Sequence, residues 1–352
     1  MSALQQSEDL RTNEVQYLMA AALSLQEEMN VGRSPDLIRR QSLAKLIFSP
    51  MWDKFLDLLT NLYCLRPEDL KKILDLATGS GEAIFTLIRS VYNNKDYGKI
   101  IGVDRDSASI EVAKAVALES LLHNIDFLEG DIPKVFEELK APFNLIMGAN
   151  AFTHFRDPQE IISKLINLLE EGGIALIFEP NTIKLEKIFK DIPEMEELNK
   201  ILGLAIKRNK YGIHINTDLM ETVEETMKKN GLINIQAIDI DVPMGFVKDS
   251  DGILDRSAAL MATLHMENFR ITQKFVVGVL GNDPDAPTIL GEPFTGERYA
   301  QLITTCCNKI IQLGHSEMYT TKMFIGQKPF TKKNDDKVIV PKETVSLSPV
   351  ES

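Results

Sequence analysis

The fold is decided by the stretch Ile73-Leu-Asp-Leu-Ala-Thr-Gly-Ser-Gly-Glu82. A short apolar run leads into a turn that contains two glycines, and a helical pattern follows the turn directly. A second apolar run, Ile100-Ile-Gly-Val-Asp104, ends on a carboxylate 23 residues after Gly81. Strand, glycine turn, helix and acid-terminated strand follow one another in the order of a nucleoside-binding βαβ unit.

The glycine turn does not fit a dinucleotide. The dinucleotide fingerprint is G-x-G-x-x-G, and its third glycine lets the helix pack closely against the strand. Here the pattern is Gly79-Ser-Gly81-Glu-Ala-Ile84, so a bulky side chain stands at the third position. Two acids, Asp75 and Glu82, flank the turn; they would repel a pyrophosphate but suit a ligand with an ammonium and a sulfonium. The turn therefore favours S-adenosylmethionine.

The rest of the chain predicts an α/β fold. Apolar strand patterns lie at 73–77, 100–104, 125–128, 143–147, 174–179, 233–242 and 318–325, and helical patterns separate most of them. Strands that alternate with helices in this way form parallel sheets with right-handed crossovers.

We expect one main domain at residues 70–330 with helical additions. Residues 1–69 predict a helical cap, with one helix from Pro35 and a second from Pro50. Two helical insertions are expected to form a lid or a subunit interface, one at 183–211 after strand 5 and one at 245–316 between strands 6 and 7. Residues 331–352 lack periodicity, which predicts a flexible tail.

Composition excludes several classes of protein. The 352 residues are 44% hydrophobic, enough to bury one large core, and the net charge of −12 disfavours a nucleic-acid substrate. The sequence shows neither a long apolar segment nor a signal-peptide pattern, so we expect no membrane span and no export. Three cysteines, Cys64, Cys306 and Cys307, lack metal-ligand spacing, which favours a reducing cytoplasm.

The chain resembles the class I S-adenosylmethionine-dependent methyltransferases, and especially their ubiquinone- and menaquinone-biosynthesis branch. The resemblance rests on five signals in the family's order: Asp75-Leu-Ala-Thr-Gly-Ser-Gly81, with Ala77 in place of the first glycine; Val103-Asp104-Arg105; Glu129-Gly-Asp131-Ile; Asn144-Leu-Ile-Met-Gly-Ala-Asn-Ala-Phe-Thr-His154; and Ile161 to Phe178. It implies a Rossmann-like, doubly wound, mostly parallel seven-stranded sheet and methyl transfer from S-adenosylmethionine.

The same resemblance implies a cofactor site. Its residues would be Asp75, Ala77, Thr78, Gly79, Ser80, Gly81, Asp104, Arg105, Gly130, Asp131, Ile132 and Asn150. Asp104 would accept both ribose hydroxyls, and Asp131 would accept the adenine amino group. Local roles are the alternatives: Asp75 could cap its turn, Asp104 could cap the next helix, Asp131 could be an ordinary loop residue, and Arg105 an exposed arginine.

His154 is the candidate catalytic base. It follows the fourth strand, past Asn150, where the family presents residues to the methyl group and the acceptor. A neutral imidazole could remove a proton from the acceptor. Alternatively, His154 only shapes the pocket, since methyl transfer to an amine or a thiolate can proceed by positioning alone. Tyr211 and His214, between the first insertion and a core helix, are candidates for substrate binding.

The absence of certain family motifs limits the types of methyl transfer that the chain could catalyse. The segment Ala149-Asn-Ala-Phe-Thr-His154 lacks the cluster of acids and amides found in the family's metal-dependent O-methyltransferases, so we expect no metal. The favoured hypothesis is a small-molecule acceptor held under the helical lid. A protein acceptor is the second hypothesis, and a catalytically silent member that binds S-adenosylmethionine as a structural partner is the third. An insertion that serves as a subunit interface would give a homodimer.

Overall fold

The core of the protein is one seven-stranded sheet in the order β3-β2-β1-β4-β5-β7-β6. The strands are β1 (Lys72–Leu76), β2 (Lys99–Asp104), β3 (Ile125–Glu129), β4 (Phe143–Ala149), β5 (Leu169–Pro180), β6 (Ile233–Gly245) and β7 (Ser316–Gln327). β1 to β5 pair in parallel, and β7 runs antiparallel to its neighbours β5 and β6. The predicted mostly parallel, seven-stranded sheet is therefore confirmed.

The computed structural model describes residues 35–93, 97–139, 142–181, 189–208, 219–248, 250, 252, 255–281, 283, 294–314 and 316–330. The predicted first part of the cap and the predicted tail at 331–352 lie outside these ranges, as do Tyr211 and His214.

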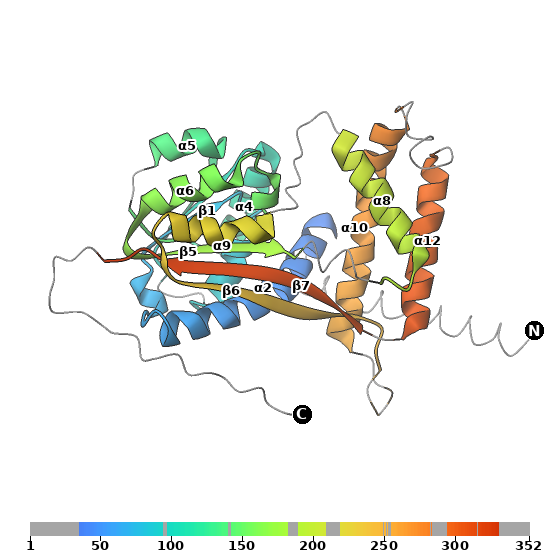
Figure 1. Ribbon diagram of the computed structural model, residues 1–352, viewed down its shortest axis with the longest axis horizontal. Coiled ribbons are helices and arrows are strands. Elements are labelled where there is room, and N and C mark those ends of the chain that lie inside the picture. Colours follow the sequence, from blue (N-terminus) through green and yellow to red (C-terminus); the bar gives the residue numbers. More distant parts are fainter. Residues whose placement is uncertain are drawn as a thin grey trace, which may run out of the picture.

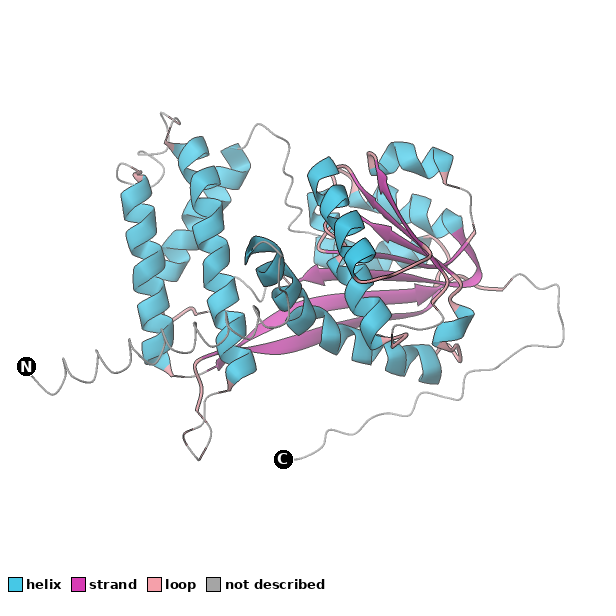
Figure 2. Ribbon diagram, turned by 180° about the vertical axis from the view of Figure 1, so that it is seen from behind, coloured by secondary structure: helices cyan, strands magenta, loops and turns pink. Residues whose placement is uncertain are grey.

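Helices cover both faces of the sheet (Figures 1 and 2). One face carries α2 (Pro35–Asn61), α3 (Glu82–Ser90) and α4 (Ser107–Glu119), and the other carries α5 (Ile132–Glu138), α6 (Pro158–Leu168) and α9 (Leu219–Lys229). Successive residues of a strand point to opposite faces, so Ile73 of β1 packs into the first core and Leu74 into the second. Apolar residues on both faces explain why the central strands read as nearly continuous apolar runs.

Helix α2 differs from the prediction. We expected a new helix to start at Pro50, but α2 runs without a break from Pro35 to Asn61 with Pro50 inside it. A proline within a helix removes one backbone hydrogen bond and usually causes a break. Here the residues that follow it are anchored by tertiary contacts: Trp52 and Phe55 are buried, and the Trp52 indole donates a 3.1 Å hydrogen bond to Thr86 Oγ1 of α3. Packing against α3 therefore outweighs the local effect of Pro50.

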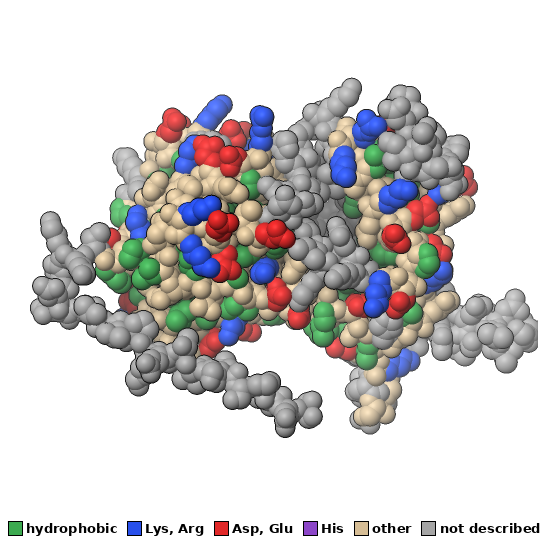
Figure 3. All heavy atoms as spheres, viewed as in Figure 1, with side chains coloured by type: hydrophobic (Ala, Val, Ile, Leu, Met, Phe, Trp, Pro, Cys, Tyr) green, Lys and Arg blue, Asp and Glu red, His purple; other side chains and the backbone are tan. Residues whose placement is uncertain are grey.

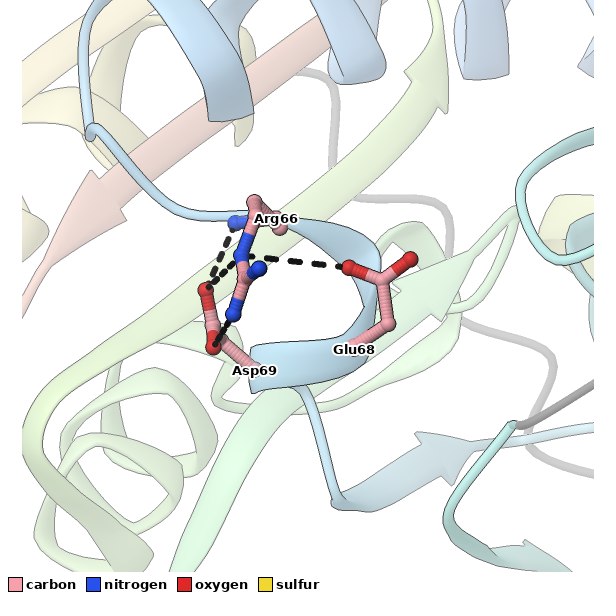
Figure 4. Close-up of polar contacts among 3 residues, drawn as sticks. All are labelled: Arg66, Glu68 and Asp69. Atoms are coloured by element: carbon pink, nitrogen blue, oxygen red, sulfur yellow. Dashed lines mark hydrogen bonds and ion pairs between the residues drawn. The ribbon is translucent and has the colours of Figure 1, made fainter.

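A short 3-10 turn, η1 (Pro67–Asp69), leads from α2 into β1. The Asp69 carboxylate accepts hydrogen bonds from the backbone N–H of Arg66 at 2.9 Å and from its Nη2 at 3.3 Å, while Glu68 lies 4.0 Å from Arg66 Nε (Figure 4). These side chains are exposed, so the contacts shape the turn and contribute little to global stability.

Three further helices form a bundle beside the sheet (Figure 1). They are α8 (Pro193–Arg208), which lies between β5 and α9, and α10 (Arg256–Leu280) and α12 (Gly296–Leu313), which lie between β6 and β7. Ion pairs join α8 to α12, between Glu197 and Arg298 and between Glu194 and Lys309. The chain leaves β5 and β6, and enters the antiparallel β7, at the carboxyl edge of the parallel strands. The bundle therefore stands beyond that edge.

Candidate active site

The candidate site lies at the carboxyl ends of β1 and β4, which are adjacent in the sheet. From β1 the chain proceeds outward to β2 and β3, and then returns to the other side of β1 to form β4. Ligands of open α/β sheets bind at such a point, where the strand order reverses. Two segments follow these strand ends: the glycine turn (residues 77–81) after β1, and the β4 turn (residues 150–154) after β4.

The backbone of the glycine turn is left-handed at three positions. The φ angles are +53° at Ala77, +55° at Gly79 and +85° at Gly81. Glycine adopts such angles without strain, whereas an L-residue does not. A Cβ at Gly81 would also lie 2.7 Å from the Phe85 ring, so that position requires glycine. Ala77 holds a conformation that its own side chain disfavours.

Asp75 supplies a buried carboxyl group directly beneath the glycine turn. Only 1% of Asp75 is exposed, and its Oδ2 has no hydrogen-bond partner among the residues that the structure describes. The hydroxyl of the buried Thr78 lies close to this carboxyl, and its interaction with Asp75 opposes the effect of burial on the Asp75 pKa. Burial raises the pKa of Asp75 to about 7. Buried polar atoms are nearly always hydrogen-bonded in folded proteins, so Asp75 Oδ2 fits a polar or cationic ligand group such as an ammonium.

Asp104 ties the end of β2 to the glycine turn. Its Oδ2 accepts the Gly79 N–H at 2.8 Å, and its Oδ1 accepts the Asp106 N–H at 2.9 Å. A carboxylate has about four acceptor sites, so both oxygens can still accept hydroxyl groups. The cap of α4 is Asp106, whose side chain accepts the Ser109 N–H at 3.1 Å. The structure thus gives the capping role to Asp106 and leaves Asp104 facing the turn.

The ends of β2 and β3 carry the other predicted cofactor residues. Arg105 and Asp131 are exposed, and Ile132 is buried at the start of α5. The Gly130 N–H donates to the Asp104 carbonyl at 2.8 Å, which extends the pairing of the two strands. Asp131 is the N-cap residue of α5, but its side chain makes no capping hydrogen bond. Its carboxylate is therefore available to a ligand.

The β4 turn is held by Glu179, which the sequence interpretation missed. Glu179 is fully buried at the end of β5, and its Oε1 accepts the N–H groups of Ala151 at 2.6 Å and Phe152 at 2.7 Å. Its Oε2 lies 3.3 Å from the Thr153 hydroxyl. Burial raises the pKa of Glu179 to about 7. The available signal was an acid that directly follows five apolar residues, Ile174 to Phe178.

The β4 turn places two predicted residues at the surface of the site. Asn150 has a φ of +54° and is exposed, and its N–H donates to the Phe178 carbonyl at 2.8 Å. His154 is exposed and ends the 3-10 turn η2 (Phe152–His154).

The described part of the chain holds neither a metal-binding cluster nor a membrane-spanning helix. No group of three or more His, Cys, Asp or Glu side chains among those residues has a metal-binding arrangement. None of their helices is long and apolar enough to cross a membrane.

Comparison with known proteins identifies relatives of this chain. A family model described as a methyltransferase domain matches residues 67–244. Demethylmenaquinone methyltransferase of Lactococcus lactis is 26% identical over 211 residues, which cover 57% of this chain and 78% of that protein. Ribosomal RNA small subunit methyltransferase G of Borrelia turicatae is 29% identical over 147 residues, 42% of this chain and 64% of that protein.

Two further matches extend the comparison. The ubiquinone/menaquinone biosynthesis C-methyltransferase UbiE of Wigglesworthia glossinidia brevipalpis is 25% identical over 177 residues, covering 49% of this chain and 68% of that protein. Among solved structures, the YcgJ protein of Bacillus subtilis aligns with a TM-score of 0.42 at 17% identity, over 78% of this chain and 98% of that one.

Proposed function

This chain belongs to the methyltransferase domain family, and from that premise we propose that it transfers a methyl group to a small-molecule acceptor without a metal ion. Its class is that of the S-adenosylmethionine-dependent methyltransferases. The acceptor, the absence of a metal and the roles of individual residues are proposals. The observation that carries the assignment of the site is the buried Asp75 Oδ2, which has no hydrogen-bond partner among the described residues.

The described residues fit the groups that S-adenosylmethionine presents. Asp75 would hold the ammonium group with Oδ2, to which no side chain or backbone group in the described part of the chain is hydrogen-bonded. Asp104 would hold the ribose hydroxyls, and Asp131 with Ile132 would hold the adenine. The glycine turn would approach the ligand with its backbone, since Gly79 and Gly81 carry no side chain. When bound, the cofactor supplies a methyl group that is already activated on a sulfonium.

Several observations support a small acceptor. Two of the relatives are named for quinone biosynthesis, and the name of one specifies demethylmenaquinone. One relative is named for ribosomal RNA, but the net charge of −12 on this chain repels a phosphate backbone. On the face shown in Figure 3, Lys and Arg side chains are interspersed with Asp and Glu rather than gathered into a basic patch.

The helical bundle provides the means to enclose an acceptor. Helices α8, α10 and α12 stand beyond the carboxyl edge of the sheet, the edge at which the glycine turn and the β4 turn lie. We propose that the segments 183–211 and 245–316 act as a lid over the acceptor, with Tyr211 and His214 as substrate contacts. A lid excludes water and holds the acceptor in line with the methyl group.

His154 has two proposed roles in the reaction. As a general base it would take a proton from a hydroxyl or a carbon acid, while as a wall of the pocket it would only orient the acceptor. Its position in the β4 turn, at the carboxyl edge and on the protein surface, is compatible with both.

Two other functions remain as alternatives. In a protein methyltransferase the bundle would be a docking surface instead of a lid. In a catalytically silent protein the cofactor would bind without turnover.

A binding measurement and a transfer measurement test these proposals in sequence. Calorimetric titration with S-adenosylmethionine, S-adenosylhomocysteine and NAD should show saturable binding of the first two alone. Saturable NAD binding with no response to the others would refute the assignment. The protein should then be incubated with methyl-labelled S-adenosylmethionine and fractionated cell extract. Label in small molecules supports the proposal, label in protein supports the protein acceptor, and binding without any transfer supports the silent protein.

A further inference from the structure

Glu179 is a second buried acid at the carboxyl edge, and it is not among the proposed cofactor contacts. It ends an apolar strand, in which Ile177 and Phe178 are core residues that are each 1% exposed. A buried carboxylate is costly unless it is hydrogen-bonded or paired with a cation. An apolar residue at this place would avoid that cost, so the carboxylate needs a specific explanation.

The partners of Glu179 come from three successive residues of the β4 turn. The N–H groups of Ala151 and Phe152 and the hydroxyl of Thr153 converge on one carboxylate. Successive N–H groups that surround an anion in this way form a small anion-binding concavity. The cross-strand neighbour of Glu179 on β7 is Lys322, but within the described residues Glu179 has no ion pair. Among the described residues, hydrogen bonds from the turn stabilise the carboxylate and partly offset the cost of its burial.

This arrangement fixes the β4 turn to β5 at two levels. The backbone bond from Asn150 N–H to the Phe178 carbonyl holds the start of the turn, and Glu179 holds the next three residues. Asn150 and His154 flank the segment that is held in this way. Their distance from the glycine turn therefore depends on where the Glu179 carboxylate lies.

We infer that Glu179 is a positioning residue for methyl transfer, whose carboxylate sets the place of the β4 turn, and thereby of Asn150 and His154, beside the bound cofactor. The inference rests on the proposed function. It assigns no proton transfer to Glu179, which is buried and acts through the turn.

The strand itself offers a matched control. Glu170, at the start of β5, accepts a hydrogen bond from the Asn144 side chain at the start of β4. It therefore also joins β4 to β5 through a glutamate, but at the amino edge, far from both turns. Removal of Glu170 breaks a contact of β5 with β4 at the amino edge, whereas removal of Glu179 breaks its contact with the β4 turn at the site.

The experiment compares Glu179→Ala and Glu179→Gln with Glu170→Ala in the full chain. Amide hydrogen exchange of the peptide that contains residues 150–154 reports the order of the turn, and calorimetry with S-adenosylhomocysteine reports the site. In Glu179→Ala we expect exchange at Ala151 and Phe152 to rise, and ligand affinity to fall, each by about tenfold or more. Glu179→Gln retains an acceptor oxygen, so it should keep part of the protection from exchange and part of the ligand affinity. Glu170→Ala should leave both at the wild-type value.

Each other outcome has a definite meaning. Wild-type exchange and affinity in folded Glu179→Gln and Glu179→Ala would overturn the inference, and so would faster exchange with unchanged affinity, which would leave Glu179 a purely structural role. Equal losses in Glu170→Ala would also overturn it. If Glu179→Ala does not fold, Glu179→Gln tests the inference alone, and we expect it to show faster exchange in the β4 turn and a partial loss of ligand affinity. A wild-type protein that binds no S-adenosylhomocysteine would refute the proposed function instead, and the exchange data would still test the turn.

Discussion

The glycine turn and the β4 turn follow adjacent strands, and each is associated with a buried acid, but the two acids differ in their hydrogen-bond partners. Burial raises the pKa values of Asp75 and Glu179 alike, to about 7. Asp75 keeps one oxygen without a partner among the described residues, whereas both oxygens of Glu179 are engaged by the β4 turn. Asp75 can therefore accept a hydrogen bond from a ligand, whereas the hydrogen bonds of Glu179 are made within the protein. The role of a buried acid therefore follows from its partners, and neither its burial nor its pKa reveals it.

The largest expected effect is on stability without ligand. The Asp75 carboxyl has a pKa of about 7 in the folded protein against an ordinary value of 3.8, so the folded state binds more protons between these limits. Stability should therefore fall as pH rises from 4 to 7, by on the order of 4 kcal/mol from this group. Asp75→Asn removes that loss and should be more stable than wild type at pH 8, while its cofactor affinity falls.

Urea unfolding at pH 5 and pH 8, with no ligand added, measures this difference. Glu179 contributes with the same sign in both proteins, because its pKa is also raised. The free energy of unfolding of Asp75→Asn should therefore still depend on pH, though less than that of wild type. If Asp75→Asn were as pH-dependent as wild type, the pKa of Asp75 would not be raised in the folded protein.

The second prediction tests what the β4 turn presents. If the acceptor is a hydroxyl or a carbon acid, His154→Ala should lower turnover by about 100-fold or more with little change in cofactor affinity. If the acceptor is an amine or a thiol, the same change should cost much less. His154→Asn and His154→Gln keep polarity but cannot take a proton near neutral pH. Wild-type turnover in all three variants, at saturating cofactor, would exclude a base and leave positioning.

The third prediction concerns Asp104, which serves both the turn and the proposed ribose site. Asp104→Ala should weaken cofactor binding by roughly 1.5–3 kcal/mol, the usual contribution of charged hydrogen bonds. Asp126→Ala is the control, because this exposed carboxylate of β3 pairs with Lys99 at 2.6 Å and does not contact the glycine turn. Calorimetry on both folded variants provides the test. An unchanged dissociation constant in Asp104→Ala would remove the ribose assignment.

The two turns also differ in how far the sequence could predict them. The glycine turn is a contiguous motif, so its residue types and spacing can be recognised in the sequence itself. The contact of Glu179 with Phe152 of the β4 turn joins residues 27 apart in the chain, and no local sequence pattern predicts it. The continuity of α2 through Pro50 was missed for the same reason, since contacts such as that of Trp52 with Thr86 decide it. Local chemistry predicted the strands and the first turn, and tertiary contacts decided the rest.

The smallest expected effect concerns Ala77, the residue with which the glycine turn departs from the family's pattern. Its φ of +53° lies in the left-handed region, which costs an L-residue about 1–2 kcal/mol. Glycine avoids this strain, but it also raises the conformational entropy of the unfolded chain, which opposes folding by a smaller amount. Ala77→Gly should therefore stabilise the protein by about 0.5–1 kcal/mol. Ala83→Gly, the same chemical change within α3, should destabilise it by a similar amount. Urea unfolding of the two variants should give opposite signs. If Ala77→Gly destabilised as well, the apolar contacts of the half-buried Ala77 would outweigh the strain, and the turn would prefer alanine for its packing.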